Sequence, residues 1–286
     1  MSKDTKSNME KGDRIAKVMA RAGLCSRRDA EKWIALGRVS INGITLKTPG
    51  VVVREGDDVR VDGKQLPTAD RARVWRFHKP KGLITTHKDE KGRTTVFEVL
   101  PSTMPRVVSV GRLDLTSEGL LLLTNDGALA RELEHPSRGW VRRYRVRVHG
   151  RVDDKGLARL KNGVTVDGVR YGPIDAHVDK APANEKTGEK TTSKSASKSN
   201  TWVTVALTEG KNREVRKVME FLGLTVNRLI RVSYGPFQLG KLDTGGLEEV
   251  PAQVVRQQLG TTAPAGLNKK RQRNEKTGKK TESDEA

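Results

Sequence analysis

The sequence predicts an α+β fold, with a small N-terminal module followed by a larger domain built on a mixed, mainly antiparallel sheet. Three observations lead to this prediction: two short amphipathic helices near the N-terminus, a run of four leucines bounded by turn formers, and later segments in which apolar residues alternate. Alternation is the period of a strand, whereas spacings of three and four are those of a helix. Strands outnumber helices, which favours α+β.

Residues 13–66 have the pattern of a compact module of two helices and several short strands. The first helix has an apolar stripe that begins at Ile15 and ends near Gly23, and Ser26 is a good N-cap for the second, which stops at Gly37. Short strands are expected at 39–41, 44–46 and 58–61, the first two joined by an Asn42-Gly43 turn. Residues 67–73 form a polar linker.

The larger domain is expected to span residues 74–259. Leu120–Leu123 indicate a short buried strand, preceded by a polar loop that carries Asp114 and followed by a tight turn at Asn125-Asp126-Gly127. Other strands are expected near 74–77, 142–148, 202–208 and 226–232, and a helix near 213–222. In 142–148, Tyr144 shares one face with two valines and three arginines occupy the other.

Three segments lack apolar periodicity. We predict a disordered leader at 1–12, a flexible Lys-, Ser- and Thr-rich insertion at 180–200 and a disordered basic tail at 260–286.

The charge of the chain indicates a polyanionic partner. Lys and Arg number 55 against 35 Asp and Glu, which gives a formal net charge of +20. No apolar run is long enough to span a bilayer, and the N-terminus lacks the apolar core of a signal peptide, so a membrane is a poor candidate. RNA and DNA remain.

The sequence indicates no metal and no cofactor. Cys25 is the only cysteine, the five histidines lack ligand spacing, and Gly210-Lys211-Asn212 lacks the rest of a phosphate-binding loop. We therefore expect a reduced, cytoplasmic protein. No amphipathic stretch is left over once the core is assigned, which favours a monomer.

The N-terminal helices carry a cluster of cations. Lys17, Arg21, Arg27, Arg28 and Lys32 can clamp phosphates, and the second helix begins at Arg27, where backbone amides also favour an anion. The alternative is a helix surface on which these residues pair with Asp29 and Glu31.

Two stretches resemble known families. Gly111–Gly127 resembles the signature of the pseudouridine synthases typified by ribosomal small-subunit synthase A and large-subunit synthases B, E and F, and Asp114 falls on that family's catalytic aspartate. Residues 13–66 resemble the alpha-L motif, a small RNA-binding module named after a small-subunit ribosomal protein. The resemblance runs from residue 13 to about 258, except for the insertion.

This resemblance implies that the chain converts a uridine in RNA to its C-glycosidic isomer without a cofactor. The bond from N1 to C1′ breaks, the base turns, and C5 is joined to C1′. Asp114 would act as a nucleophile, at the ribose carbon or at C6 of the base, or as the base that shuttles a proton. An ordinary Asp has a pKa near ~3.9, which desolvation beneath a stacked base would raise, so an ionised Asp114 needs a nearby cation.

The resemblance also implies roles for other residues. In Gly210–Arg216, the family's third motif, Arg216 would pair with Asp114, although Arg213, Arg216 and Lys217 could also merely cover a helix face. Tyr144 falls on a conserved aromatic that stacks on the base, although its pattern alone fits a sheet-core residue equally well.

Four further positions are assigned to RNA or to the pocket. Arg112 would fill the gap left by the flipped base or contact a phosphate, and Lys79 belongs to a basic turn similar to the family's Lys-Pro element. Lys79 and Arg213 are predicted to bind RNA, and a leucine, Leu229 or Leu242, would wall the pocket.

Residues 209–217 and 223–229 most resemble the large-subunit synthase B branch of the family. We therefore expect the substrate to be ribosomal RNA of the large subunit, free or in an assembly intermediate. Two other functions remain open: a non-catalytic ribosome-assembly factor that binds RNA with the same fold, and a DNA-binding protein. Against the DNA-binding hypothesis, no segment of the sequence resembles a recognition helix with a dimerisation element.

Overall fold

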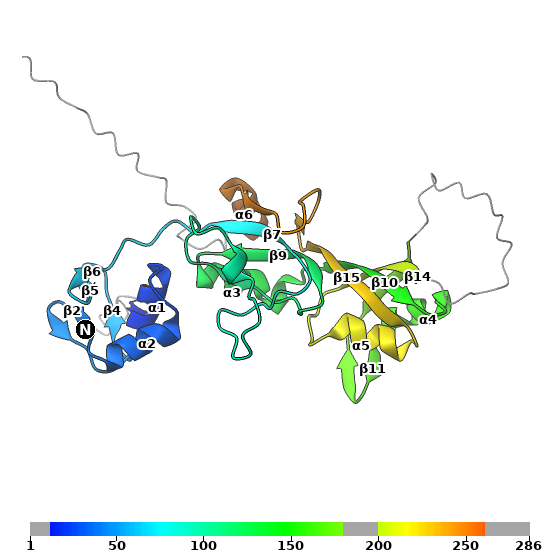
Figure 1. Cartoon of the computed structure of the whole chain (residues 1–286), viewed down its shortest axis with the longest axis horizontal. Helices are drawn as coiled ribbons and strands as arrows, with labels where there is room; N and C mark the ends of the chain where they lie inside the picture. Colours follow the sequence, from blue (N-terminus) through cyan, green and yellow to red (C-terminus); the bar gives the residue numbers. More distant parts are fainter. Residues whose placement is uncertain (1–11, 180–199, 261–286) are drawn as a thin grey trace, which may run out of the picture.

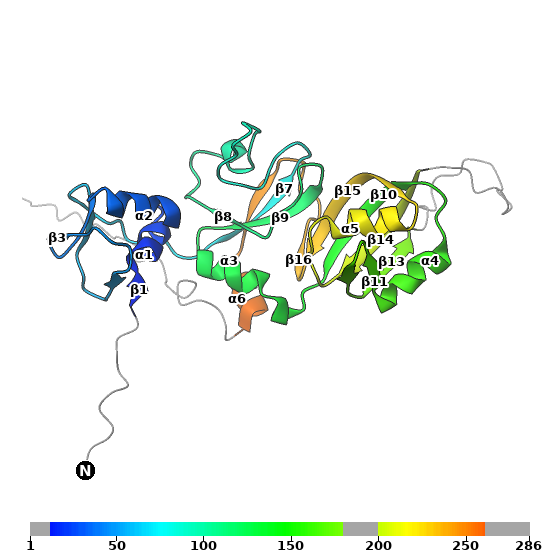
Figure 2. The same ribbon diagram turned by 90° about the horizontal axis from the view of Figure 1, so that it is seen from below.

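The computed structural model describes residues 12–179 and 200–260 (Figure 1). The predicted leader, insertion and tail therefore lie outside the described residues, apart from their edges. An N-terminal module lies at one end of the molecule, beside β7, β9 and α3, and the strands β13 and β14 lie toward the other end (Figures 1 and 2).

The N-terminal module contains the two predicted helices, α1 (Ile15–Arg21) and α2 (Arg27–Ala35). Ser26 caps α2, because its Oγ accepts a hydrogen bond of 3.0 Å from the Asp29 amide, which confirms the predicted N-cap. The short strands of the module are β1 (Asp13–Arg14), β2 (Val39–Ile41), β3 (Ile44–Thr45), β4 (Val52–Val53), β5 (Val59–Val61) and β6 (Lys64–Gln65). Four of these strands form a sheet in the order β3-β2-β5-β6, and β1 pairs with β4.

A nine-stranded sheet forms the larger domain, in the order β13-β14-β10-β15-β9-β7-β17, with β16 paired to β15 and β8 to β9. Its strands are β7 (Val74–Lys79), β8 (Val108–Val110), β9 (Glu118–Thr124), β10 (Arg142–His149), β13 (Ile174–Val178), β14 (Asn200–Leu207), β15 (Thr225–Tyr234), β16 (Phe237–Gln238) and β17 (Leu247–Val250). All pairings in this sheet are antiparallel except that of β15 with β9. The predicted α+β architecture with a large mixed, mainly antiparallel sheet is confirmed.

Helices cover both faces of this sheet. They are α3 (Gly127–Glu134), α4 (Asp154–Arg159), α5 (Glu214–Phe221) and α6 (Ala252–Leu259). A hairpin of β11 (Val164–Val166) and β12 (Val169–Tyr171) lies beside α5 (Figure 1), and short 3-10 turns occur at Phe97–Val99, Pro136–Arg138 and Leu160–Asn162.

The leucines of β9 are buried on both faces of the sheet. Leu121 and Leu123 join a core that includes residues of β10, β14 and α5, whereas Leu120 and Leu122 join a second core with α3 and α6. Successive side chains of a strand point to opposite faces, so a strand packed on both sides contains an unbroken apolar run. This is why the buried strand was recognisable in the sequence.

The segment after β9 differs from the prediction of a tight turn. Asp126 is the N-cap of helix α3, and its Oδ1 accepts hydrogen bonds from the amides of Ala128 at 2.8 Å and Leu129 at 3.0 Å. Asp and Asn favour turns and helix N-caps alike, and the following Ala and Leu residues favour a helix. The turn prediction was wrong because it took Asp126 as a turn former and did not recognise it as the N-cap of the helix that follows.

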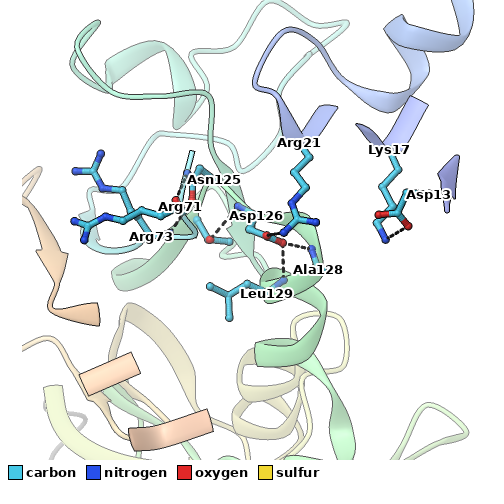
Figure 3. A network of polar contacts seen from close by, with 10 residues as sticks. Asp13, Lys17, Arg21, Arg71, Arg73, Asn125, Asp126, Ala128 and Leu129 are labelled. Atoms are coloured by element: carbon cyan, nitrogen blue, oxygen red, sulfur yellow. Dashed lines mark hydrogen bonds and ion pairs between the residues drawn. The ribbon is translucent and has the colours of Figure 1, made fainter. Parts of the chain in front are cut away.

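The start of α3 also contacts the N-terminal module. Arg21 at the end of α1 points toward Asp126, at 3.5 Å between Nη2 and Oδ2 (Figure 3). Beside it, Asn125 binds the linker, since its amide donates to the Arg71 carbonyl and its carbonyl accepts from the Arg73 amide. The N-terminal module, the linker and the start of α3 therefore meet at residues 125–126. None of the helices in the described ranges is both long and apolar enough to cross a membrane.

One glycine permits the single parallel pairing of the sheet. Gly119 has a φ of +103°, and a Cβ placed there would lie 2.3 Å from the carbonyl oxygen of Arg231. We predict that Gly119→Ala lowers the free energy of unfolding by at least about 2 kcal/mol, from backbone strain and steric overlap. Denaturant unfolding measures this.

Gly127→Ala is the matched control, because a Cβ at the start of α3 would meet no atom within 4 Å. It should change the free energy of unfolding by less than about 1 kcal/mol. Similar losses for the two variants would contradict the role assigned to Gly119.

Candidate active site

Asp114 lies in the loop between β8 and β9, as predicted. Each backbone carbonyl of this loop accepts a hydrogen bond, and all but one of the donors lie outside the loop. Thr85 Oγ1 donates to Leu113 O at 2.9 Å, Ser117 N to Asp114 O at 3.0 Å and Gly82 N to Leu115 O at 2.8 Å. Arg216 Nη2 donates to Thr116 O at 3.0 Å, and Lys79 Nζ donates to Ser117 O at 2.9 Å.

Every carbonyl from Leu113 to Ser117 therefore accepts a hydrogen bond. A loop whose backbone is satisfied in this way has few alternative conformations, so the backbone that carries the Asp114 side chain keeps a fixed position. A third of its side chain remains exposed, so a substrate can reach it.

Arg216 lies near Asp114 but does not form the predicted ion pair. Its guanidinium donates instead to Thr116 O and to Val226 O, and the cation that faces Asp114 is Arg213, at 3.8 Å between Nη1 and Oδ2. Burial lowers the pKa of the Arg216 guanidinium, an effect that Arg213 reinforces and Asp114 opposes. The predicted pairing is corrected in detail: Arg213 supplies the contact, and Arg216 positions the loop.

The backbone explains this exchange of partners. Arg213 has a φ of +51° at the N-cap of α5, and this left-handed conformation precedes the helix that carries Arg216. Arg213 lies beside Asp114 with 48% of its side chain exposed, and its assignment to RNA stays a prediction.

Lys79 does not lie where RNA can reach it. The side chain is fully buried, and Nζ donates to Pro80 O and Ser117 O. Burial lowers its pKa to about 8, although Asp114 and Glu118 act in the opposite direction. The prediction that Lys79 binds RNA is wrong, because a basic residue at the end of a strand was assigned to the surface.

Tyr144 and Leu229 line the same cavity as Asp114. The cavity has a volume of about 270 Å³ and opens beside the loop of Asp114. Leu229 lines it and Leu242 does not, which decides between the two leucines that the sequence offered. Tyr144 is 9% exposed, so its ring is a wall of the cavity as well as a part of the core.

A second, larger cleft lies between the N-terminal module and the larger domain. Its volume is about 1290 Å³, and ten of its lining residues are Lys or Arg whereas four are Asp or Glu. Lys17, Arg21, Arg27, Arg28 and Arg112, all predicted to bind RNA, line this cleft. Arg112 also lines the cavity of Asp114, so it stands where the two spaces adjoin.

Several lining residues were not predicted from the sequence. The cleft adds Lys88, Arg106 and Arg131, and the cavity adds Arg142 and Arg231. Arg142 belongs to the alternating segment that contains Tyr144, two residues away, so its position on the Tyr144 face was available from the strand period. The cleft residues come from separate loops and helices and carried no comparable signal.

Glu214 is also part of the cavity. Burial raises the pKa of its carboxyl, while Oε2 accepts a hydrogen bond of 2.9 Å from the Lys211 amide. Among the described residues, no group of three or more His, Cys, Asp or Glu side chains is arranged to hold a metal ion.

The burial of Lys79 predicts a pH dependence of stability. Its pKa falls from 10.5 to about 8 on folding, so between these values the unfolded chain binds the proton that the folded chain has released. The free energy of unfolding is therefore highest above pH 10.5, where Lys79 is neutral in both states, and it decreases as the pH falls to 8. The free energy of unfolding should therefore rise with pH in this window, by at most about 1.4 kcal/mol per pH unit.

Lys79→Met removes this titration, and chemical unfolding of both proteins from pH 7 to 10 measures it. The stability of the natural protein relative to Lys79→Met should grow as the pH rises. A constant difference would show that Lys79 keeps its ordinary pKa.

Comparison with known proteins agrees with this geometry. Residues 73–221 match the RNA pseudouridylate synthase family, and residues 13–64 match the S4 domain. A protein of Rickettsia felis described as an uncharacterized RNA pseudouridine synthase is 44% identical over 242 residues, which cover 85% of this chain and 98% of the relative.

Other relatives carry a more specific name, ribosomal large subunit pseudouridine synthase B. That of Haemophilus influenzae is 43% identical and that of Pasteurella multocida 41%, and the alignments cover 85% and 86% of this chain and 66% and 69% of the relatives. A crystal structure of a pseudouridylate synthase has the same fold, with a TM-score of 0.57 at 22% identity, over 86% of this chain and 99% of that one. The chain is therefore a member of the RNA pseudouridine synthase family, with an S4 domain preceding the isomerase domain.

Proposed function

We propose that this enzyme converts a uridine of ribosomal RNA, in the large subunit, to pseudouridine, with Asp114 as the catalytic carboxylate. The observation that carries the proposal is the fixed position of Asp114 in a cavity with Tyr144, next to a cleft dominated by cations. The large-subunit target is supported by the named relatives and by residues 209–217, whereas a small-subunit target has no such support.

The two spaces suit different parts of the substrate. The cleft can take the phosphates of an RNA segment, since ten cations line it, and the smaller cavity can take one flipped base. Arg112, which lines both, would occupy the place that the base leaves or contact a nearby phosphate. Arg21 would act differently from Lys17, Arg27 and Arg28, since its ion pair with Asp126 also joins the S4 domain to α3.

In the cavity, the reaction needs no added atom. The N1–C1′ bond breaks, the base turns, C5 binds C1′, and the proton lost from C5 is balanced by one gained at N1. Tyr144 would stack on the base, while Asp114 would act at C1′, at C6 or as the proton carrier. Arg213 Nη1 lies 3.8 Å from Oδ2 of this carboxylate.

A pseudouridine map of all ribosomal RNA from a strain lacking the gene tests the proposal, with complementation by the natural enzyme or by Asp114→Ala. One large-subunit site that is lost on deletion and restored only by the natural enzyme supports it. A small-subunit site would reject the target. No changed site would favour an RNA-binding assembly factor, a function that the cationic cleft alone would also permit.

Asp114→Asn should abolish turnover while RNA binding stays within about twofold, because the amide keeps the shape of the side chain but is no nucleophile or base. Single-turnover assays and filter binding on the mapped RNA measure this. Asp175→Asn is the control, since Asp175 is exposed on β13 and does not line the cavity. Turnover by Asp114→Asn at the natural rate would reject Asp114 as the catalyst.

Arg216 and Arg213 should differ in their effects. Arg216→Gln removes the donor to Thr116 O and should slow the single-turnover rate about 10- to 100-fold, since a hydrogen bond from a charged group contributes about 1.5–3 kcal/mol. Arg213→Gln removes only the longer contact and should cost less than about tenfold. The reverse order would show that the pairing with Asp114 matters more than the position of the loop.

A further inference from the structure

Arg231 is one of four arginines that line the cavity of Asp114, and within the described residues it has no charged partner. Arg231 of β15 is 3% exposed and faces Tyr144 of β10 and Gly119 of β9 in the strand register. Its Nε donates to Leu120 O at 2.7 Å, and its guanidinium carbon lies 5.1 Å from the centre of the Tyr234 ring. Within residues 12–179 and 200–260, Nη2 has no hydrogen-bond partner and the side chain forms no ion pair.

This arrangement is unfavourable in the free protein. Arginine keeps its proton under all ordinary conditions, so burial cannot neutralise it. A buried charge without a partner, or a buried donor without an acceptor, destabilises the fold, and such groups therefore need a functional explanation. The hydrogen bond to Leu120 O uses only Nε, and among the described residues it leaves the buried Nη2 without an acceptor.

The place of Arg231 shows which part of a substrate would meet it. Tyr144, its register partner, is the expected stacking residue, and Asp114 lines the same cavity. A base held between Tyr144 and Asp114 would bring its ring, rather than its phosphate, to this wall. Uracil offers two carbonyl oxygens as acceptors for a guanidinium N–H.

We propose that Arg231 is a further catalytic residue, which donates a hydrogen bond to a carbonyl oxygen of the flipped uracil and stabilises the negative charge that the base acquires during the reaction. This proposal rests on the proposed function. Stabilisation of developing charge by a fixed donor in a site shielded from water is among the largest effects available to an enzyme.

The charge arises on the base by either route. If the N1–C1′ bond breaks first, its electron pair remains on uracil and spreads over N1 and the carbonyl oxygens, while C1′ is captured by Asp114 or Asp114 takes a proton from C2′. When C5 then binds C1′, the bond from Asp114 to C1′ breaks or the proton returns to C2′. If Asp114 adds to C6 first, the C5–C6 π pair moves toward C5 and O4, C5 then binds C1′ as the N1–C1′ bond breaks, and the bond from Asp114 to C6 breaks as C5 loses its proton. In every case C5 loses its proton and N1 gains one.

The test uses the full-length enzyme and a stem-loop that contains the mapped uridine. Arg231→Gln should lower the single-turnover rate about 100-fold or more, the usual effect of removing one such donor, while the Kd for RNA changes less than threefold. Arg231→Lys, which keeps the charge, should recover at least tenfold of this loss. Thermal unfolding of each variant reports whether the fold is intact.

A 5-fluorouridine substrate separates charge stabilisation from a structural role. Fluorine at C5 stabilises the uracil anion, so the difference between Arg231→Gln and the natural enzyme in the rate of N1–C1′ cleavage should shrink at least tenfold. Arg76→Gln is the matched control, because Arg76 also donates to a backbone carbonyl but has Glu248 as a partner and does not line the cavity. This variant should keep the natural rate.

Three results would overturn the proposal: an unchanged rate in Arg231→Gln, a loss confined to RNA affinity, or an equal loss on both substrates. Failure of the natural enzyme to modify any RNA would instead overturn the proposed function, so the two failures are distinguishable.

Discussion

The hydrogen bonding of the carbonyls from Leu113 to Ser117 is the constraint on which the site depends. The donors come from β7, the loop after it, the loop of Asp114 itself and helix α5, so residues far apart in the sequence converge on five consecutive peptide groups. A loop on a protein surface is ordinarily mobile, because water can satisfy its backbone in many conformations. Here the protein itself satisfies the backbone of the loop in one conformation. A carboxylate that acts on a substrate needs such a fixed position relative to the reacting atom.

The need to satisfy backbone carbonyls also explains two charged residues inside the fold. Lys79 is buried and Arg216 is half-buried, and each gives hydrogen bonds to carbonyl oxygens rather than to a carboxylate. Asp114 raises the pKa of both cations, against the lowering that burial causes. The side chains that hold the backbone of the loop are therefore also coupled by charge to Asp114.

In the proposed function, the cationic cleft and the cavity would divide the recognition of RNA. Cations around the cleft would attract phosphates without regard to sequence, whereas the cavity beside Asp114 would admit a base only after it has left its helix. Arg112 lies where the two spaces adjoin. The ion pair of Arg21 with Asp126 joins the S4 domain to α3, the helix that begins directly after β9, so both walls of the cleft are connected to the strand that follows Asp114.

The sequence by itself determined several of the local elements and the position of the loop that carries Asp114. Some features depend only on neighbours in the chain: the alternation on β10, the leucine run of β9 and the Ser26 cap. The resemblance to a known family located Asp114, Tyr144 and the third motif. Only the tertiary structure decided that Arg213 rather than Arg216 faces Asp114, that Lys79 is buried, that Leu229 walls the cavity and that Arg231 reaches it. These facts depend on contacts across roughly forty to a hundred and twenty residues, set by strand register and by a left-handed residue before α5, and no periodicity encodes such contacts.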